Sequence, residues 1–280
     1  MNRALKSAFF RFFRTKWFLR VLFFSLFTGL IIIFNTVTTN YGFVFYMRPR
    51  YFDREFLDMC IIGVMIVLPF LIAIFCTSFT GNDLQFRSIN NKVATGISRK
   101  CIYLADLAAV ITATVIGFAV TTGVIFAYYK FWPTRGSQRI DAHIIRITFY
   151  VLITCIAFAA FNTLMQYFFS NKFFALIVTL LIIPCILILS QNLEAKLNEP
   201  YRYYIENEET GEGAWTLNPH YVGGTSRKVL TFVYDTIPYG FQNFLEEGSS
   251  KFEKSMIAGA IVVTVTTAAG IEVIKKRELS

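Results

Sequence analysis

The residues whose types could do chemistry gather in one polar segment, "FTGNDLQFRSINNKVATGISRKCIYLADL", which runs from Phe79 to Leu107. It holds amides, hydroxyls, two carboxylates and four cations, but neither of the two histidines of the chain. An enzyme would need a nucleophile beside a base, or a metal motif such as H-E-x-x-H, which the sequence lacks. We expect His143 and His220 to lie outside the membrane spans. The segment therefore favours a mechanical or binding role over catalysis.

Turn and capping residues predict a short helix in the middle of this segment. Ser88 can cap a helix over "INNKVA", and Gly96 can end it. The residues "SRK" then begin the next helix, so that Ile102 and Tyr103 enter the membrane. We expect a short helix roughly parallel to the membrane and held between two rigid spans. A partner that presses on it would move both spans together.

Long apolar runs on both sides must position this segment. The sequence of 280 residues is 55% hydrophobic, 17% aromatic and only 16% charged, whereas soluble domains carry about 25% charged residues. Runs of roughly 18 or more apolar residues are typical of membrane-spanning helices. Six such runs occur, at residues 20–39, 57–79, 102–128, 147–169, 173–190 and 256–274. The predicted fold class is an all-α integral membrane protein with six transmembrane helices in a single domain, residues 17–280.

Residues 1–16 predict a separate amphipathic helix. On a helical wheel, four cations fall on one side and five apolar residues on the other. The cations are Arg3, Lys6, Arg11 and Arg14, and the apolar residues are Leu5, Ala8, Phe9, Phe12 and Phe13. This pattern is typical of a helix that lies in the membrane interface. A basic anchor that only fixes topology is a compatible alternative.

Lysine and arginine predict the orientation of the spans. Six spans place both termini on one side, together with the segment around Arg99 and Lys100. Short segments on that side carry twice as many cations as short segments on the other. Because cations are enriched in short cytoplasmic segments, we expect both termini in the cytoplasm of a bacterial plasma membrane. The net charge of +9 then reflects topology and contact with anionic lipid, and nucleic acid is not an expected partner.

The polar segment resembles the signature loop of type-2 ABC exporter permeases. In that family, an acid at the end of span two precedes a Thr-Ile-x-Asn-Lys-like helix, and a Gly-x-Ser-Arg-x-x-Ile-Tyr segment opens span three. Asp83 stands at the position of the family's acid, and Arg87 stands where the family usually has a glycine. The matching loop, residues 80–101, predicts a coupling site of Asp83, Arg87, Ser88, Ile89, Asn90, Asn91, Lys92, Val93, Gly96, Ser98 and Arg99. The basic N-terminal helix, the six spans and the long segment before the last span extend the resemblance over nearly the whole chain.

The resemblance implies a transport subunit energised by another protein. In such exporters this loop is a coupling helix, which docks in a groove of a cytoplasmic ATPase. The chain has no G-x-x-x-x-G-K-[ST] phosphate loop, so we expect no cofactor on it, and ATP and Mg²⁺ on two partner ATPase subunits. A second permease subunit, identical or homologous, is also expected. The expected cargo is a hydrophobic or amphipathic molecule, with an antimicrobial peptide, a drug or a lipid as the candidate classes.

The segment of residues 192–255 is expected to lie outside the cell. Its stretch "ENEETGEGAW" is acidic and is expected to be solvated. Beyond it, Val229, Phe232 and Val233 can share a helical face, and a second short amphipathic piece starts at Phe241. By analogy with the family, short external helices would gate the exit. The candidate gate residues are Tyr234, Pro238, Tyr239, Gly240 and Phe241.

Two other functions stay open. An ion-coupled secondary transporter would normally place charged groups near the middle of the membrane, where the predicted spans have none. A non-transporting membrane sensor or immunity protein would need neither a motor nor a path. Small residues in spans three and six, such as Gly117 and Gly270, predict close helix packing. Asn162 and Gln166 could face a cavity or form hydrogen bonds between helices.

Overall fold

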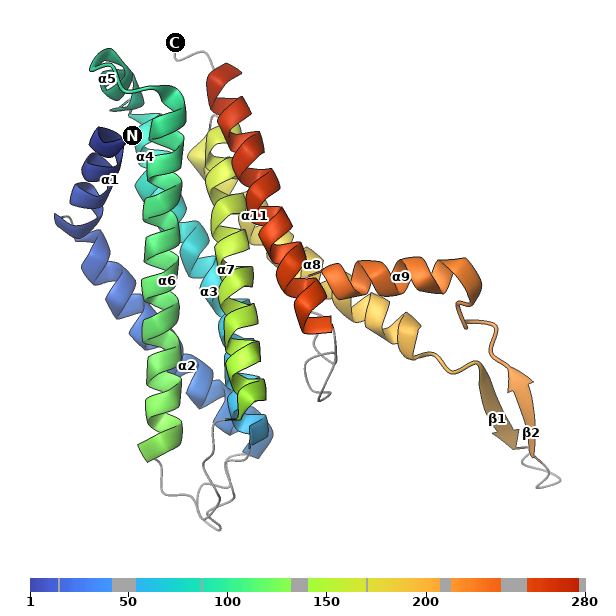
Figure 1. Ribbon diagram of the computed structural model, residues 1–280. Coiled ribbons are helices and arrows are strands. Elements are labelled where there is room, and N and C mark those ends of the chain that lie inside the picture. The colour runs from blue at the N-terminus through green and yellow to red at the C-terminus, as the bar shows by residue number, and fades with distance from the viewer. Residues whose placement is uncertain are drawn as a thin grey trace.

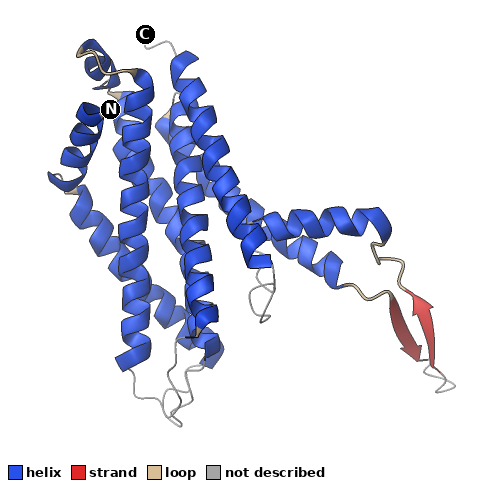
Figure 2. Cartoon of the chain, in the orientation of Figure 1, coloured by secondary structure: helices blue, strands red, loops and turns tan. Residues whose placement is uncertain are grey.

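The computed structural model describes residues 1–14, 16–41, 54–86, 88–131, 141–169, 171–206, 213–237 and 251–276. Helices make up nearly all of this part of the chain (Figure 2). Six helices in these residues are long and apolar enough to cross a membrane. The predicted class, an all-α multi-pass membrane protein, is therefore confirmed at this level.

The six candidate spans agree in number and order with the apolar runs. Within the described residues they extend over Trp17–Thr38, Phe56–Gln85, Arg99–Phe131, Ala142–Phe168, Lys172–Asn198 and Met256–Lys276. The corresponding helices are α2 (Trp17–Tyr41), α3 (Arg54–Cys76), α6 (Arg99–Phe131), α7 (Ala142–Phe168), α8 (Lys172–Asn198) and α11 (Lys251–Lys276). The largest difference is at α8, which continues past the predicted end at residue 190 through the polar stretch "QNLEAKLN". Apolar periodicity could not predict this extension, because that stretch is no longer apolar.

Helices α3, α6 and α7 form the centre of the bundle, and α2, α8 and α11 lie around them. Close contacts at glycines allow this packing, as the small residues predicted. A Cβ at Gly117 of α6 would lie 2.9 Å from Ser25 Oγ of α2, and a Cβ at Gly270 of α11 would overlap the Tyr103 ring. Gly123 has nothing within 4 Å of an added Cβ. Small residues therefore set the distance between the helices at Gly117 and Gly270, and not at Gly123.

The N-terminal helix and the polar segment meet at one end of the bundle. Helix α1 (Asn2–Arg14), the short helix α5 (Ser88–Ala94) and the last turn of α11 all lie there (Figure 1). A π-helix, η1 (Thr77–Gly81), continues α3 and leads through α4 (Asn82–Gln85) toward α5. The chain thus approaches α5 from the second span and leaves it into the third.

Helix α1 packs on the bundle by a face that differs from the predicted one. Ala4, Ala8 and Phe12 are buried, whereas Phe13 is half exposed. The Phe12 ring contacts the rings of Phe75 and Phe79 at centroid distances of 5.8 and 6.4 Å. The helix is amphipathic as predicted, but part of its apolar face meets protein instead of lipid. Periodicity shows that a helix has an apolar face and does not show what covers that face.

The chain between α8 and α11 extends away from the bundle (Figure 1). It contains an antiparallel hairpin of β1 (Arg202–Glu206) and β2 (Gly213–Leu217), followed by helix α9 (Gly224–Thr236). This hairpin was not predicted. It includes part of the acidic stretch, and Trp215 there is 66% exposed, as expected of a solvated segment. Tyr204 and Trp215 are paired across the hairpin with ring centroids 5.5 Å apart, and such cross-strand aromatic pairs stabilise sheets. Helix α9 lies where one of the two short amphipathic pieces was predicted, while the second predicted piece lies outside the described residues.

Candidate functional site

The short helix predicted in the polar segment exists and ends at a glycine. Helix α5 begins at Ser88, so Ser88 is its first residue rather than a cap before it. Gly96 has φ +83°, its N–H bonds Val93 O at 2.9 Å, and the N–H of Ile97 bonds Lys92 O at 3.2 Å. This pair of hydrogen bonds is the Schellman motif, which satisfies the last carbonyls of a helix. The backbone therefore fixes both the length of α5 and the direction in which the chain leaves it.

Ile89 anchors α5 on one side of the helix, and the opposite side of the helix is exposed. Ile89 is 1% exposed and packs in a small core with Leu84, Val93 and Ile102. Asn91, Ala94 and Thr95 are exposed. Phe86, just before α5, is 73% exposed. An exposed aromatic side chain beside exposed polar groups is typical of a surface that binds protein.

Asp83 connects α5 to the N-terminal helix. Lys92 Nζ of α5 donates to Asp83 Oδ2 at 2.6 Å, and the Arg11 guanidinium of α1 forms an ion pair with the same carboxylate. Asp83 is mostly buried, and Arg11 and Lys92 are each about three-quarters buried. Charge-assisted hydrogen bonds of this kind are about twice as strong as neutral ones. The carboxylate therefore holds two helices against the end of the second span.

Arg11 extends the connection to the third and fourth spans. Its Nη2 donates to Asp106 Oδ1 of α6 at 3.2 Å, and Tyr167 Oη of α7 donates to Asp106 Oδ2 at 2.8 Å. Asp106 is 1% exposed. The Arg11 guanidinium also lies over the Phe79 ring, 3.9 Å from its centroid. A buried carboxylate is tolerated when it is paired and hydrogen-bonded, and Asp106 meets both conditions.

The π-helix η1 adds a second set of polar contacts beneath α5. Gln166 Nε2 donates to Thr77 Oγ1 at 2.8 Å, and Lys172 Nζ donates to Asn82 Oδ1 at 2.6 Å. A Cβ at Gly81 would lie 2.7 Å from Gln166 Oε1, so glycine is required for this approach. Gln166 therefore bonds between helices, which was one of its two predicted roles. Single-turn π-helices occur frequently at functional sites.

The structure brings together part of the predicted coupling site. Asp83, Lys92, Ile89 and Val93 belong to one connected cluster. Arg99 points elsewhere, because its Nη1 donates to Lys275 O at the end of α11 at 3.4 Å. The exposed or half-buried residues Ser88, Asn90, Asn91, Gly96 and Ser98 lie on the surface around α5. Arg87 lies outside the described residues.

Sequence reasoning missed four residues of this site, namely Arg11, Asp106, Tyr167 and Phe86. Arg11 was placed on the cationic face of an interfacial helix, yet it is paired with two carboxylates. A signal existed, because Asp106 lies inside an apolar helix and a carboxylate there needs a partner. No local pattern identifies that partner, since Arg11 and Asp106 are 95 positions apart in the sequence.

Among the candidate gate residues, the structure describes Tyr234. This residue is buried, and its hydroxyl donates to Glu194 Oε2 of α8 at 3.1 Å. It therefore holds α9 against the end of α8. Val229 and Phe232 on α9 are exposed. The other candidates, Pro238, Tyr239, Gly240 and Phe241, lie outside the described residues.

The expectation that both histidines lie outside the spans is wrong for His143. It stands in the first turn of α7, inside the fourth candidate span. Its Nε2 is 3.9 Å from Asp58 Oδ2 of α3. The apolar run was predicted to start at residue 147, but α7 begins at Ala142. A buried pair of titratable groups thus lies at the end of the bundle opposite α5.

Comparisons of the chain with protein-family models, with curated proteins and with solved structures gave no match. The functional argument therefore rests on the residues and on the geometry described above.

Proposed function

We propose that this chain is the membrane subunit of an ATP-driven exporter, with α5 as the helix on which a separate ATPase acts. Two ATPase subunits would supply ATP and Mg²⁺, and a second membrane subunit, identical or homologous, would complete the path. The chain would lie in a bacterial plasma membrane with α1, α5 and both termini on the cytoplasmic side. The cargo would be a hydrophobic or amphipathic molecule. The resemblance of the loop to type-2 ABC exporter permeases supports this assignment.

The observation that carries the proposal is the chain of charged contacts from α5 into the bundle. Lys92 of α5 binds Asp83, and Asp83 binds Arg11. Arg11 binds Asp106, and Asp106 binds Tyr167. A force on α5 therefore reaches α1, α4, α6 and α7 through contacts that are mostly buried. A merely solvated loop would not need such connections.

The exposed side of α5 supplies the surface on which the proposed ATPase would dock. Asn91 of α5 is exposed, and so is Phe86 just before α5, while the buried Ile89 anchors the helix. Substitutions at Phe86 and Asn91 can therefore change docking without removing the anchor. Ile89 is unsuitable for such a test, because loss of a buried isoleucine would disturb α5 itself.

The test is co-purification of the chain from its native membranes in a mild detergent, with bound proteins identified by mass spectrometry. We expect an ATPase with Walker motifs to accompany the wild type. The variant F86A/N91A should retain about tenfold less of that ATPase, since interface anchors carry most of the binding energy. The matched control is F131A, which removes an 81% exposed phenylalanine at the far end of α6. Equal retention by both variants, or the absence of an ATPase from the wild type, would refute the proposal.

One observation favours a second candidate, an ion-coupled secondary transporter. Asp58 and His143 form a mostly buried pair between α3 and α7, at the end of the spans opposite α5 and not in their middle, and titratable groups inside spans often mark proton paths. In that case, uptake or export by reconstituted vesicles would follow an imposed pH gradient without ATP, and D58N would abolish it. An exporter driven through α5 would require ATP, and the pH gradient alone would drive nothing.

A further inference from the structure

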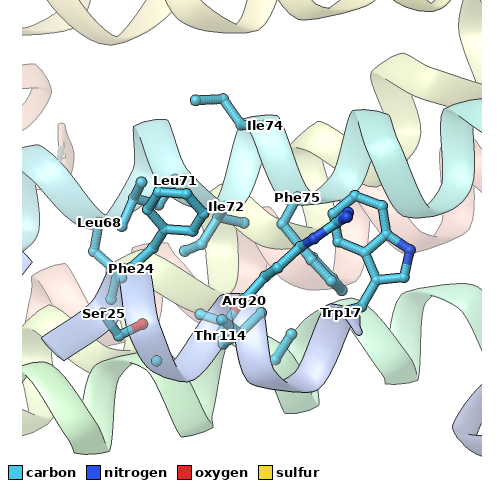
Figure 3. A pocket seen from close by; sticks show the side chains of 13 residues that line it. Trp17, Arg20, Phe24, Ser25, Leu68, Leu71, Ile72, Ile74, Phe75 and Thr114 are labelled. Carbon is cyan, nitrogen blue, oxygen red and sulfur yellow. The ribbon is translucent and has the colours of Figure 1, made fainter. Parts of the chain in front are cut away.

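A groove on the outside of the bundle lies between α2, α3 and α6, near the end that carries α1. Its volume is about 150 Å³. Its walls are apolar side chains, including Val21, Phe24, Leu68, Leu71 and Ile72. Figure 3 shows these side chains together with Arg20 and Trp17. Every lining residue belongs to a candidate span, and Phe24 and Ile74 are 51% and 49% exposed, so the groove opens on the surface that a bilayer would cover.

The inner end of the groove is closed by a tight helix contact. Gly117 and Ser25 lie there, so close that a Cβ on Gly117 would be 2.9 Å from Ser25 Oγ. Thr114 does not expose an unpaired hydroxyl, because its Oγ1 donates to Val110 O at 2.9 Å. Between Leu68 and Phe75, α3 rises about 10 Å along the groove. This length is comparable with much of the depth of one leaflet, about 15 Å.

The outer end of the groove is cationic. Arg20 lines it, with its guanidinium 4.5 Å from the centroid of the Trp17 ring. Trp17 in turn rests edge-on against Phe75, with ring centroids 6.0 Å apart. Among the residues that the structure describes, no carboxylate is paired with Arg20. Tryptophan and arginine at the start of a span are typical of the headgroup level of a membrane.

We propose that this groove binds one acyl chain of an anionic phospholipid, whose phosphate is held by Arg20. The apolar walls suit a hydrocarbon acyl chain. The Arg20 guanidinium suits a phosphate, which it can bind through two parallel hydrogen bonds. Charge complementarity decides the headgroup. Between Met1 and Arg20 the sequence has six cations and no acid, so an anionic lipid is attracted to this end of the chain. The site is independent of the proposed ATPase coupling.

Trp17 provides a direct readout of the site. In a variant in which Trp132 and Trp215 are replaced by phenylalanine, Trp17 is the remaining tryptophan of the three. Its fluorescence can be measured in phosphatidylcholine vesicles that contain brominated phosphatidylglycerol or, separately, brominated phosphatidylcholine. We expect the apparent affinity for phosphatidylglycerol to be about fivefold higher than for phosphatidylcholine. This is the gain expected when one basic residue contacts an anionic headgroup.

Two pairs of variants separate a site from general attraction. R20Q should remove the preference for phosphatidylglycerol, whereas the control R14Q should keep it, because Arg14 is exposed and does not line the groove. A113L, which fills the groove, should reduce quenching by both lipids, whereas V115L on the same helix should not. An equal loss of preference in R20Q and R14Q would overturn the proposal. Unchanged quenching in a folded A113L would also overturn the proposal. If A113L does not fold, the comparison of R20Q with R14Q decides the question alone.

Discussion

Arg11 joins the two carboxylates at the α5 end of the bundle. It pairs with Asp83 and Asp106 and also covers the Phe79 ring. R11Q leaves Asp106 buried with Tyr167 as its remaining hydrogen-bond partner in this network. We expect a loss of about 2 kcal/mol in stability, since removing one partner of a buried pair is strongly destabilising. Thermal unfolding in detergent measures this loss.

The control for R11Q lies on the same helix. R14Q removes an exposed cation whose described contact is with the Phe10 ring, and its unfolding temperature should stay within the error of the wild type. In addition, the double variant R11L/D106N should be less destabilised than the sum of its single variants, because it removes both charges. Equal unfolding temperatures for R11Q and R14Q would show that the ion pairs contribute nothing to stability.

Gly96 is the second residue with a specific structural requirement. Its φ of +83° is unfavourable for any residue with a Cβ, although no atom lies within 4 Å of that position. We therefore expect G96A to cost about 1 kcal/mol through the backbone alone. The amides of residues 88–97 should exchange with deuterium about fivefold faster, which mass spectrometry of the peptides detects.

Gly123 provides the comparison for Gly96, because an added Cβ would also meet nothing there but the backbone is helical. G123A should leave exchange in residues 88–97 unchanged and should not destabilise the protein, since alanine is the better helix former. Faster exchange in both variants would contradict the assignment of the effect to the left-handed backbone at Gly96.

At the scale of elements, the contact between α6 and α11 depends on Gly270. The Tyr103 ring occupies the space of a side chain there, and Tyr103 Oη lies 3.4 Å from Thr266 O. We expect G270A to separate the two helices and to cost about 2 kcal/mol, as overpacking does. Thermal unfolding should show the loss.

A second substitution tests the cause of that loss. Y103A empties the space beside Gly270, so G270A/Y103A should be no less stable than Y103A alone. Further destabilisation of the double variant would mean that Gly270 is needed for a reason other than the Tyr103 ring.

At the scale of the whole molecule, the sequence predicts the membrane architecture well and the site only in part. Long apolar runs predicted the six helices, and Ser88 and Gly96 predicted α5, because these features depend on local composition and backbone geometry. The contact between Arg11 and Asp106 spans 95 positions and arises only from packing. The hairpin of β1 and β2 was missed because the acidic residues in the sequence between its strands outweighed the tyrosines, isoleucine and tryptophan of the strands.

In the proposed mechanism, the charged contacts would make α5 move only together with α1. Asp83 is contacted from both helices, so the N-terminal helix fixes the position from which α5 would be pushed. The proposed motor would therefore act on a unit formed by α1, α5 and the ends of three spans. The lipid groove at the start of α2 lies next to this unit, and its occupant would contact the same end of the bundle.

The measurement that tests the central claim most directly is site-specific photocrosslinking in membranes that contain the chain and its natural partners. A photoreactive amino acid replaces Asn91 on the exposed side of α5 or, as the control, Phe131 at the opposite end of α6. The account predicts a crosslink from position 91 to an ATPase with Walker motifs, and none from position 131. A position 91 that forms no such crosslink, in a protein that is folded and inserted, would contradict the role of α5 as the site of coupling.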